Sequence, residues 1–288
     1  MQRERMSSTS LSASPRPARV APRTTQALPW ALDPDVRTGW LSAVAGGATG
    51  VFLDYDGTLT PIAERPEQAT LSASTRARLS RLALSCPVTI VTGRDVAVVR
   101  GFVRLDEIGY AGCHGLDIEG ADGTGLRYEA AETLLPALDG AEAELRRGLS
   151  GVAGALVERK RYSVSTHYRL VDARHAPVVE EVVAAVARSY PQLRRERGKK
   201  VFELRPNVAW DKGSAVAWLL DALSLDPGAA IYIGDDETDE HAFELFDGDG
   251  VPIVVEQGDR PTSARYRVSD PREVTEVLDL LIETLESR

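Results

Sequence analysis

The sequence lacks the features that define several large protein classes. It holds only two cysteines, Cys86 and Cys113, in 288 residues. Two thiols are too few for a disulfide framework and are typical of a reducing compartment. No apolar run approaches the roughly 20 residues of a membrane span, and no internal repeat is present. We therefore expect a globular, cytoplasmic protein without a membrane anchor.

Positive charge is also scarce outside the N-terminal region. The chain has 34 Lys and Arg against 43 Asp and Glu, a formal net charge of −9. Residues 1–31 contain five arginines and a single acid, so the rest of the chain is more acidic still. An acidic body argues against a nucleic-acid-binding surface. The hydrophobic fraction of 43% is ordinary and suffices for one large or two modest domains.

The first 31 residues have little capacity to fold by themselves. They are rich in Ser, Pro, Arg, Thr and Ala and show no periodic apolar pattern, which predicts a disordered tail. An Arg- and Ser-rich, acid-poor segment also fits a transit peptide, but we prefer the plain tail; the apolar stretch of a secretory signal is missing. A short helix within 32–48 should follow, so that residues 1–48 form a tail and lead-in helix.

The most informative stretch is Val51–Thr60, VFLDYDGTLT. An apolar run that meets turn residues predicts a buried strand ending in a loop, and open parallel sheets bind ligands beyond the carboxyl ends of their strands. Because alternate residues of a strand share a face, Asp54 and Asp56 should share one space. Their repulsion would be relieved by a hard cation, Mg²⁺ above all. Gly57 would let the backbone turn close to a ligand.

Two other interpretations of this stretch are weaker. An isolated Asp-Gly pair would usually be an ordinary polar turn, but here a second acidic loop follows later in the chain. A calcium-binding loop is excluded, because Leu59 and Arg65 stand where such a loop requires Gly and Glu.

The next strands also end in chemically suggestive turns. A strand at 87–91 runs into Thr92-Gly93-Arg94, where a hydroxyl and free backbone N–H groups could hold a phosphate. This signal is weak by itself. A third strand at 108–112 leads to His114, which could be catalytic, although a structural loop histidine is the preferred interpretation. Other predicted core elements are helices at 71–84, from 95, at 212–223 and at 272–285, a polar hairpin at 119–130, and strands at 229–233 and 251–255.

The middle of the chain breaks this alternation of strands and helices. Predicted helices at 134–149 and 176–190 are combined there with strand-like segments at 155–170 and 200–206. This change indicates an inserted domain. The expected fold is therefore α/β, with a doubly wound parallel-sheet core formed by 49–130 and 208–288. A smaller α/β cap domain, 131–207, is inserted into it.

A second acidic loop, Gly234–Asp239, follows the predicted strand at 229–233. Alone it could be a solvated turn. Parallel strands all end on one edge, however, so this loop can meet Asp54, and two acidic loops need a cation between them. Thr92 could hold phosphate oxygens and Lys212 could add positive charge. These groups fit phosphoryl transfer, in which one carboxylate attacks phosphorus and its neighbour moves protons.

Seven segments carry a family resemblance. The segments DYDGTLTPI, VTGR, DKG and GDDETDEHAF match, in order, the motifs of haloacid-dehalogenase-type phosphatases. The segments GCHGLDI, ERKRYSVSTHYR and GKKVFELRPNVAWDKG narrow the resemblance to the trehalose-6-phosphate phosphatases. It covers about 50–245. It implies a haloacid-dehalogenase-like core and an Mg²⁺-dependent trehalose-phosphatase that acts in trehalose biosynthesis.

The resemblance also implies roles for individual residues. Asp54 would be the nucleophile that forms an aspartyl-phosphate, and Asp56 the general acid and base. Thr92 and Lys212 would hold the phosphate. The Mg²⁺ ligands would be the Asp54 side chain, the Asp56 carbonyl and Asp235, supported by Asp236 and Asp239. Candidate substrate-binding residues are Gly57, Thr58, Gly93 and Arg94 in the core and Glu158, Lys160, His167, Arg169, Lys199, Glu203 and Arg205 in the cap.

Strand alternation within 162–170 and 199–207 supports the cap candidates that lie there, whereas Glu158 and Lys160 are implied by the resemblance alone. Each segment has one polar and one largely apolar face, which predicts a sheet backed by helices. If the two strands pair, Glu203 should lie beside His167 and Arg169. The polar face could bind sugar hydroxyls, or it could simply meet water.

Two rival functions remain open. The same core could act on another sugar phosphate. Alternatively, the chain could be a catalytically silent, sugar-phosphate-binding regulatory module. The silent module predicts a missing nucleophile or missing metal carboxylates, and none is missing. A trehalose-phosphate synthase on a separate chain is a possible functional partner; no synthase domain is recognisable in the sequence.

Overall fold

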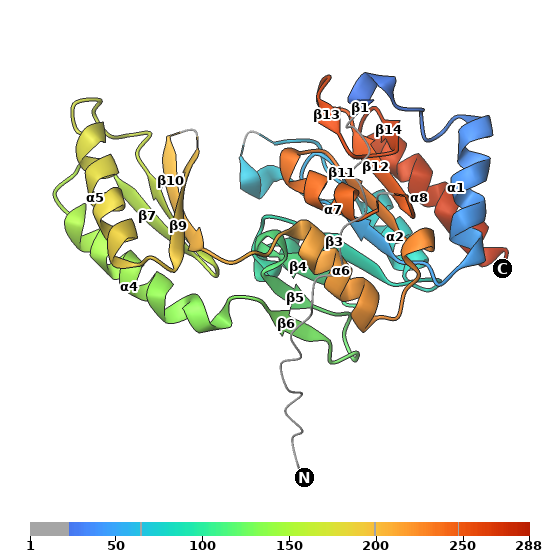
Figure 1. The fold of residues 1–288 in the computed structure, drawn as a ribbon, viewed down its shortest axis with the longest axis horizontal. Helices are drawn as coiled ribbons and strands as arrows, with labels where there is room; N and C mark the ends of the chain where they lie inside the picture. Colours follow the sequence, from blue (N-terminus) through green and yellow to red (C-terminus); the bar gives the residue numbers. More distant parts are fainter. Residues whose placement is uncertain (1–22, 64, 199, 247) are drawn as a thin grey trace, which may run out of the picture.

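The computed structural model describes residues 23–63, 65–198, 200–246 and 248–288. These residues form a large α/β unit and a smaller one that stand side by side, joined by two connecting segments (Figure 1). In the described residues, no helix has the length and apolar character that a membrane crossing requires.

The large unit is built on an eight-stranded sheet with the order β14-β12-β11-β2-β3-β4-β5-β6. The strands from β14 to β4 are parallel, and β5 and β6 add an antiparallel edge that confirms the predicted hairpin. Along the chain they are β2 (Val51–Leu53), β3 (Val88–Val91), β4 (Gly109–Gly112), β5 (Asp117–Glu119), β6 (Arg127–Glu129), β11 (Ile231–Gly234), β12 (Val251–Val255) and β14 (Tyr266–Val268).

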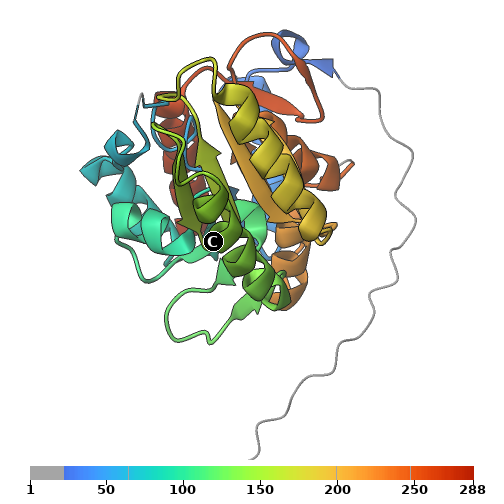
Figure 2. The same ribbon diagram turned by 90° about the vertical axis from the view of Figure 1, so that its left-hand side faces the viewer.

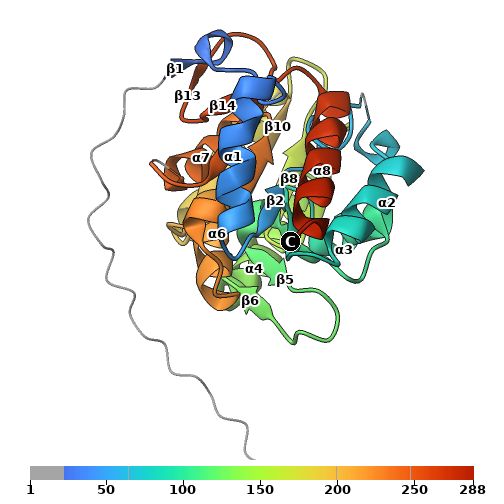
Figure 3. The same cartoon turned by 90° about the vertical axis from the view of Figure 1, so that its right-hand side faces the viewer.

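Helices cover both faces of this sheet, as a doubly wound fold requires. Val51 and Leu53 of β2 pack with α1 (Pro34–Gly46), α2 (Ala73–Leu82), α3 (Val96–Val103) and α8 (Pro271–Glu286). Figure 3 shows α1 and α8 on this face. Phe52 points to the other face, against α6 (Lys212–Ala222) and α7 (Glu240–Leu245). The all-apolar run of β2 follows from burial on both faces. Short 3-10 turns lie at Thr25–Ala27, Pro66–Gln68, Cys113–Gly115, Glu132–Leu134, Pro227–Ala229 and Glu237–Asp239.

The smaller unit lies between β6 and α6 in the chain. Its four-stranded antiparallel sheet has the order β7-β8-β10-β9. The elements are α4 (Leu135–Gly148), β7 (Leu156–Lys160), β8 (Ser163–His167), α5 (Ala176–Ser189), β9 (Leu193–Gly198) and β10 (Val201–Pro206). Both helices cover the outer face of the sheet (Figure 2) and share a separate apolar cluster with it. The face of the sheet that the helices leave uncovered is turned toward the large unit (Figure 1).

The N-terminal prediction needs correction. Residues 23–31 are ordered: β1 (Arg23–Thr24) pairs with β13 (Pro261–Thr262), and Leu28 and Ala31 are buried. Disorder was expected from composition, but the partners of this segment lie more than 200 residues away, beyond the reach of any local pattern. Residues 1–22 lie outside the described residues.

Strand β9 was not predicted, because its sequence, LRRERG, has almost no apolar residues. Its register places Arg197 opposite Phe202 and Arg195 opposite Leu204. Both guanidinium groups lie over the Phe202 ring, with their central carbons 5.4 and 5.7 Å from its centroid. Cation–π contacts and the aliphatic parts of these two arginines therefore cover the Phe202 ring, as apolar side chains usually do in a strand.

Candidate active site

Three adjacent parallel strands end at the same edge of the large sheet. Asp54 follows β2, Asp235 follows β11 and Thr92 follows β3. The Asp54 amide donates a hydrogen bond to the carbonyl of Ile233 at 2.8 Å, which joins the first two strand ends directly. The prediction that both acidic loops meet on one sheet edge is confirmed.

Lys212 is held at the centre of this edge by the start of α6. Asp211 caps the helix by accepting from the Ser214 amide at 2.7 Å. The Lys212 Nζ donates to Asp54 Oδ1 and to Asp239 Oδ1, both at 2.8 Å. Its side chain is 2% exposed. Burial by itself would lower the pKa of this ammonium, but Asp239 and Asp54 outweigh burial and raise it, so the group stays charged.

Asp239 organises the loop around it. Its Oδ1 also accepts from the Tyr232 hydroxyl at 2.6 Å, and its Oδ2 accepts from the amides of Asp235 and Asp236, each at 3.0 Å. Both carboxylate oxygens therefore have protein partners. Asp239 orders the second acidic loop around Lys212, which fits the supporting role predicted for it.

Negative charge exceeds positive charge at this edge. Oxygens of Asp54, Asp235 and Asp239 lie within 4.8 Å of one another, with one ammonium among them. Burial, together with neighbouring carboxylates, raises the pKa of Asp54 well above its ordinary range and that of Asp235 to about 7. Asp235 Oδ1 is buried without a hydrogen-bond partner. A hard divalent cation with oxygen ligands fits this donor set, because it would satisfy that oxygen and relieve the repulsion.

The turn after β2 approaches the second acidic loop very closely. Gly57 has φ = +82°, and a Cβ there would lie 2.0 Å from Asp235 Oδ2. Only glycine fits both the conformation and the space. The next hydroxyl, Thr58 Oγ1, is buried and has no hydrogen-bond partner. An unpartnered hydroxyl beside the carboxylates is a group that a phosphate oxygen could satisfy.

Asp56 lies beyond the end of the strand. Strand β2 ends at Leu53, so the strand alternation from which its direction was predicted does not extend to Asp56. The Asp56 carboxylate instead accepts two hydrogen bonds from Arg94, both 2.6 Å long. The Arg94 guanidinium lies over the rings of Tyr55 and Phe102. This predicted substrate-binding arginine thus holds the predicted acid–base group.

The turn after β3 is shaped by His114. Thr92 is buried and its Oγ1 accepts from the Arg94 amide at 3.2 Å. A Cβ on Gly93 would lie 2.7 Å from His114 Nε2, so the imidazole packs directly on this turn. Burial, helped by Arg205 and Lys212, lowers the pKa of His114 to about 3. His114 is therefore a neutral imidazole that packs on Gly93.

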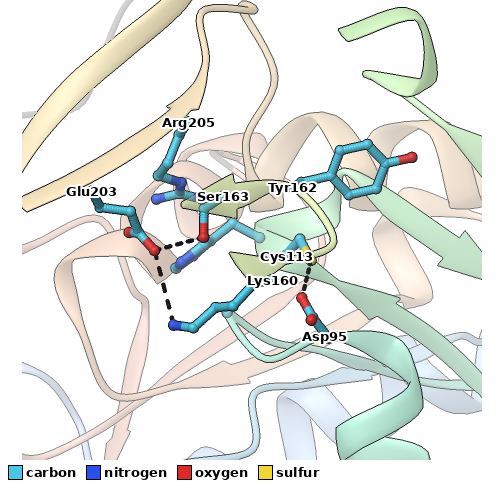
Figure 4. A pocket seen from close by; sticks show the side chains of 9 residues that line it. Asp95, Cys113, Lys160, Tyr162, Ser163, Glu203 and Arg205 are labelled. Carbon is cyan, nitrogen blue, oxygen red and sulfur yellow. Dashed lines mark hydrogen bonds and ion pairs between the residues drawn. The ribbon is translucent and has the colours of Figure 1, made fainter. Parts of the chain in front are cut away.

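A cavity of about 80 Å³ lies between the two units (Figure 4). It is lined by Gly93, Asp95, Cys113 and His114 from the large unit and by Lys160, Tyr162, Ser163, Glu203 and Arg205 from the small one. Four of the predicted substrate-binding residues, one from the core and three from the cap, therefore meet around one space.

Strand pairing inside the small unit is as predicted, but the neighbours of Glu203 are not. Glu203 is opposite Ser165 and accepts from the hydroxyls of Ser163 at 2.7 Å and Ser165 at 3.1 Å. Lys160 Nζ lies 3.9 Å away. His167 is opposite Val201 instead, and its Nε2 lies 2.7 Å from Glu158 Oε2.

Two further cap predictions do not stand as expected. Arg169 is exposed in the turn after β8, because that strand ends at His167, and so it does not lie beside Glu203. Lys199 lies outside the described residues.

Comparison with known proteins settles the family. A model of the trehalose-phosphatase family matches residues 52–272. The chain belongs to this family. Trehalose 6-phosphate phosphatase RA3 from Zea mays is 40% identical over 255 residues, covering 83% of this chain and 71% of that protein.

Solved structures agree with the fold. The crystal structure of a trehalose-6-phosphate phosphatase related protein superposes with a TM-score of 0.68 at 29% identity, covering 83% of this chain and 100% of that one. A haloacid dehalogenase-like hydrolase from Bacteroides thetaiotaomicron has a TM-score of 0.58 at 16% identity, over 83% of this chain and 98% of that one, which shows the fold alone. The predicted family and core type are confirmed.

Some residues of this family member were missed from the sequence. Arg260 donates from Nη2 to the carbonyls of Asp235 and Asp236, both at 3.1 Å, and from Nη1 to Glu240 at 2.7 Å. Arg260 thus holds the backbone of the acidic loop through these hydrogen bonds. Tyr232, which donates to Asp239, was seen only as a strand residue. No local pattern marks an arginine that hydrogen-bonds distant carbonyls, whereas a tyrosine just before the acidic loop could have been noted.

Proposed function

We propose that the chain carries out the reaction that its family name describes, hydrolysis of trehalose 6-phosphate to trehalose and phosphate. The observation that supports this most directly is the buried group of Asp54, Lys212, Asp235 and Asp239 at one sheet edge. The turn after the neighbouring strand contributes Gly93 to a cavity whose other wall is the cap. A buried group of this kind suits phosphoryl transfer, where catalysis is mostly positioning and charge stabilisation.

In the first step, a carboxylate oxygen of Asp54 attacks phosphorus and the bond from phosphorus to the sugar oxygen breaks. Asp56 donates its proton to that leaving oxygen, which yields trehalose and an aspartyl-phosphate. In the second step, Asp56 takes a proton from water while the water oxygen attacks phosphorus, which frees phosphate and restores Asp54. For both steps, Asp56 must turn away from Arg94, which holds it here.

Mg²⁺ is the proposed cofactor. The Asp54 and Asp235 carboxylates and the Asp56 carbonyl would hold it, and the fit rests on the unpartnered Asp235 oxygen. Asp239 would act through the loop that it orders, and Asp236 by capping that loop, since its Oδ1 accepts from the Thr238 amide at 2.7 Å. When bound, the ion neutralises phosphate charge in the transition state.

Phosphate oxygens would be held by the turns around the nucleophile. Thr92 and Thr58 offer hydroxyls, and Gly93 offers a backbone amide at a point where no side chain fits. The Gly57 amide donates to the Thr60 carbonyl at 2.8 Å, so Gly57 contributes the close approach of its backbone. Lys212 orients Asp54 by donating a hydrogen bond to its Oδ1.

Residues 131–207 would recognise the sugar. They would act as a cap domain on a core formed by 49–130 and 208–288. Around the cavity, Glu203 would accept hydrogen bonds from sugar hydroxyls, and Lys160 and Arg205 would donate to them. The remaining proposed contacts are Glu158, His167, Arg169 and Lys199.

A cytoplasmic location is part of the proposal. Cys86 and Cys113 are both free thiols and both buried, as suits a reducing compartment. The substrate would come from a separate trehalose-phosphate synthase.

The test is phosphate release from trehalose 6-phosphate, sucrose 6-phosphate, glucose 6-phosphate and p-nitrophenyl phosphate. We expect kcat/KM for trehalose 6-phosphate to exceed the others by about tenfold or more, a modest difference in transition-state binding. Acid quenching should trap phosphate on Asp54. Equal rates on all four esters, or none on trehalose 6-phosphate, would refute the proposal.

A further inference from the structure

The turn between β7 and β8 is the point at which the cap hairpin reaches the core. Arg161 sits in this turn. Its amide donates to Asp95 Oδ2 at 3.1 Å. Its guanidinium places Nε 3.2 Å from Asp117 Oδ2 and Nη2 2.8 Å from Glu129 Oε1. One cap residue is therefore tied to three separate elements of the core.

The buried carboxylate of Asp117 depends on Arg161 for most of its charge compensation. The Asp117 side chain is 2% exposed, and its Oδ1 is buried without a hydrogen-bond partner. Apart from Arg161, the nearest cation is Arg127, whose Nη2 lies 4.0 Å away. Burial raises the pKa of Asp117, and Arg161 opposes this shift more than Arg127 does. Withdrawing Arg161 would leave a buried carboxylate poorly compensated, which is costly.

The next residue anchors the same turn by packing. Tyr162 is 1% exposed and lies in an apolar cluster with Cys113 and Leu116 of the core. Its hydroxyl donates to Glu129 Oε2 at 3.1 Å, so Arg161 and Tyr162 share that carboxylate. The turn is thus docked by charge and by apolar contact together.

Asp95 connects this docking to the catalytic edge. It follows directly after the turn formed by Thr92, Gly93 and Arg94, and its Oδ1 accepts from Cys113 Sγ at 2.8 Å (Figure 4). Its other oxygen binds the Arg161 amide. The proposed phosphate-holding turn and the cap hairpin are therefore fixed to the same carboxylate.

The residues that flank this anchor line the cavity. Lys160 precedes Arg161, and Ser163 follows Tyr162; both lie next to Glu203 in Figure 4, with contacts of 3.9 and 2.7 Å. Moving the turn would move these two polar groups relative to Gly93 and Asp95 on the opposite wall.

We propose that Arg161 is a positioning residue that sets the place of the cap's polar groups over the phosphate-holding turn. It acts through Lys160 and Ser163 and touches neither phosphate nor nucleophile. This role rests on the proposed function, because it concerns how far the sugar contacts stand from the phosphate site.

Arg127 supplies a matched control. It binds Glu119 and Glu129, both at 2.6 Å, and faces Asp117, yet all its partners belong to the core. Arg127→Ala removes one positive charge from the same carboxylates without cutting a tie to the cap. Arg161→Ala removes the charge and the tie.

The experiment compares Arg161→Ala, Arg161→Lys and Arg127→Ala by hydrogen exchange and kinetics. In Arg161→Ala, exchange of the amides in 160–163 should rise about tenfold or more while exchange in β2 and β11 stays the same. The KM for trehalose 6-phosphate should rise about tenfold with a smaller change in kcat, and kcat/KM for p-nitrophenyl phosphate should change less than twofold. Arg127→Ala should show neither change, and Arg161→Lys should recover part of the loss.

A double variant sharpens the assignment. If the ion pair with Asp117 is what holds Arg161 on the core, then adding Asp117→Asn to Arg161→Ala should cause no further rise in KM or in amide exchange at 160–163.

Three outcomes would overturn the proposal. These are unchanged exchange at 160–163, the same exchange and KM changes in Arg127→Ala, and equal losses on both substrates. If the wild-type protein does not hydrolyse trehalose 6-phosphate, the proposed function fails, and the exchange comparison still decides whether Arg161 holds the turn.

Discussion

The catalytic edge of the core and the polar face of the cap hold their charged groups in different ways. In the core, the side chains of Lys212 and Asp239 are 2% and 0% exposed, and their contacts are close to 2.8 Å. On the cap, the side chains of Lys160 and Glu203 are 40% and 25% exposed and stand 3.9 Å apart. The core edge therefore holds closely paired, desolvated charges, whereas the cap face holds solvated charges that are farther apart.

This contrast matches two different tasks. Charge that develops on a transferring phosphate is stabilised best by groups that are already oriented in a dry site. Sugar hydroxyls are exchanged for water on binding, so recognition groups can remain solvated until the sugar arrives. Substitutions in the core should therefore abolish chemistry on every substrate, whereas substitutions on the cap should change the choice among substrates.

The largest effect is expected for Asp54→Asn. It replaces the proposed nucleophile with a neutral amide of nearly the same shape, so kcat should fall about 1,000-fold or more on both trehalose 6-phosphate and p-nitrophenyl phosphate. Circular dichroism should show a folded protein, since Lys212 keeps its contact with Asp239. Near-normal turnover of the purified variant would show that Asp54 is not the nucleophile.

Asp235→Asn tests the proposed metal site of the core. Activity should be lost or should need far more Mg²⁺, because a charged ligand is missing. In metal-free solution the melting temperature should rise, because repulsion with Asp54 and Asp239 is relieved, and the further rise on adding Mg²⁺ should disappear.

Glu237→Gln, an exposed change in the same acidic loop, is the control for Asp235→Asn. It should keep both the activity and the Mg²⁺-induced rise in melting temperature. Wild-type activity that survives exhaustive chelation would contradict the metal assignment.

Glu203→Ala tests the cap. It removes the acceptor shared by Ser163 and Ser165, and loss of a hydroxyl partner costs on the order of 1–3 kcal/mol. We expect kcat/KM for trehalose 6-phosphate to fall roughly tenfold and that for p-nitrophenyl phosphate to change little. Glu180→Ala, on the outer helix α5, should affect neither. A parallel loss on both substrates would indicate a structural role for Glu203.

The last effect concerns stability and not catalysis, and it involves His114, at the boundary between the two regions. Its pKa is about 3 in the folded chain against an ordinary value of 6.5. Between these values only the unfolded chain takes up the proton. The contribution to stability is therefore complete above pH 6.5 and is lost as pH falls toward 3, by up to about 1.4 kcal/mol per pH unit.

Urea unfolding at pH 7 and pH 5 can measure this effect. His114→Gln should make the free energy of unfolding less sensitive to acid than it is in the wild-type protein. Equal pH dependence in the two proteins would mean that His114 is not buried as a neutral group.

Much of the core site could be predicted because local pattern and sheet topology agree. Apolar runs that stop at Asp54, Thr92 and Asp235 predicted buried parallel strands, and parallel strands must end on a common edge. The alternation of polar and apolar residues in β10 likewise predicted a cap sheet with one covered face. These features depend on residues close together in the chain, and so composition and spacing reveal them.

What the sequence by itself determined was therefore the central core strands β2, β3, β4, β11 and β12, the edge on which their acids meet and the family. Only the tertiary structure decided that Asp56 turns to Arg94, that residues 23–31 pair with β13, that arginines of β9 cover Phe202, and that Arg161 docks on Asp117. Each of these contacts joins side chains or strands that neither periodicity nor turn signals relate to one another. Their partners become neighbours only when helices and sheets pack, and burial then sets which charges must be paired.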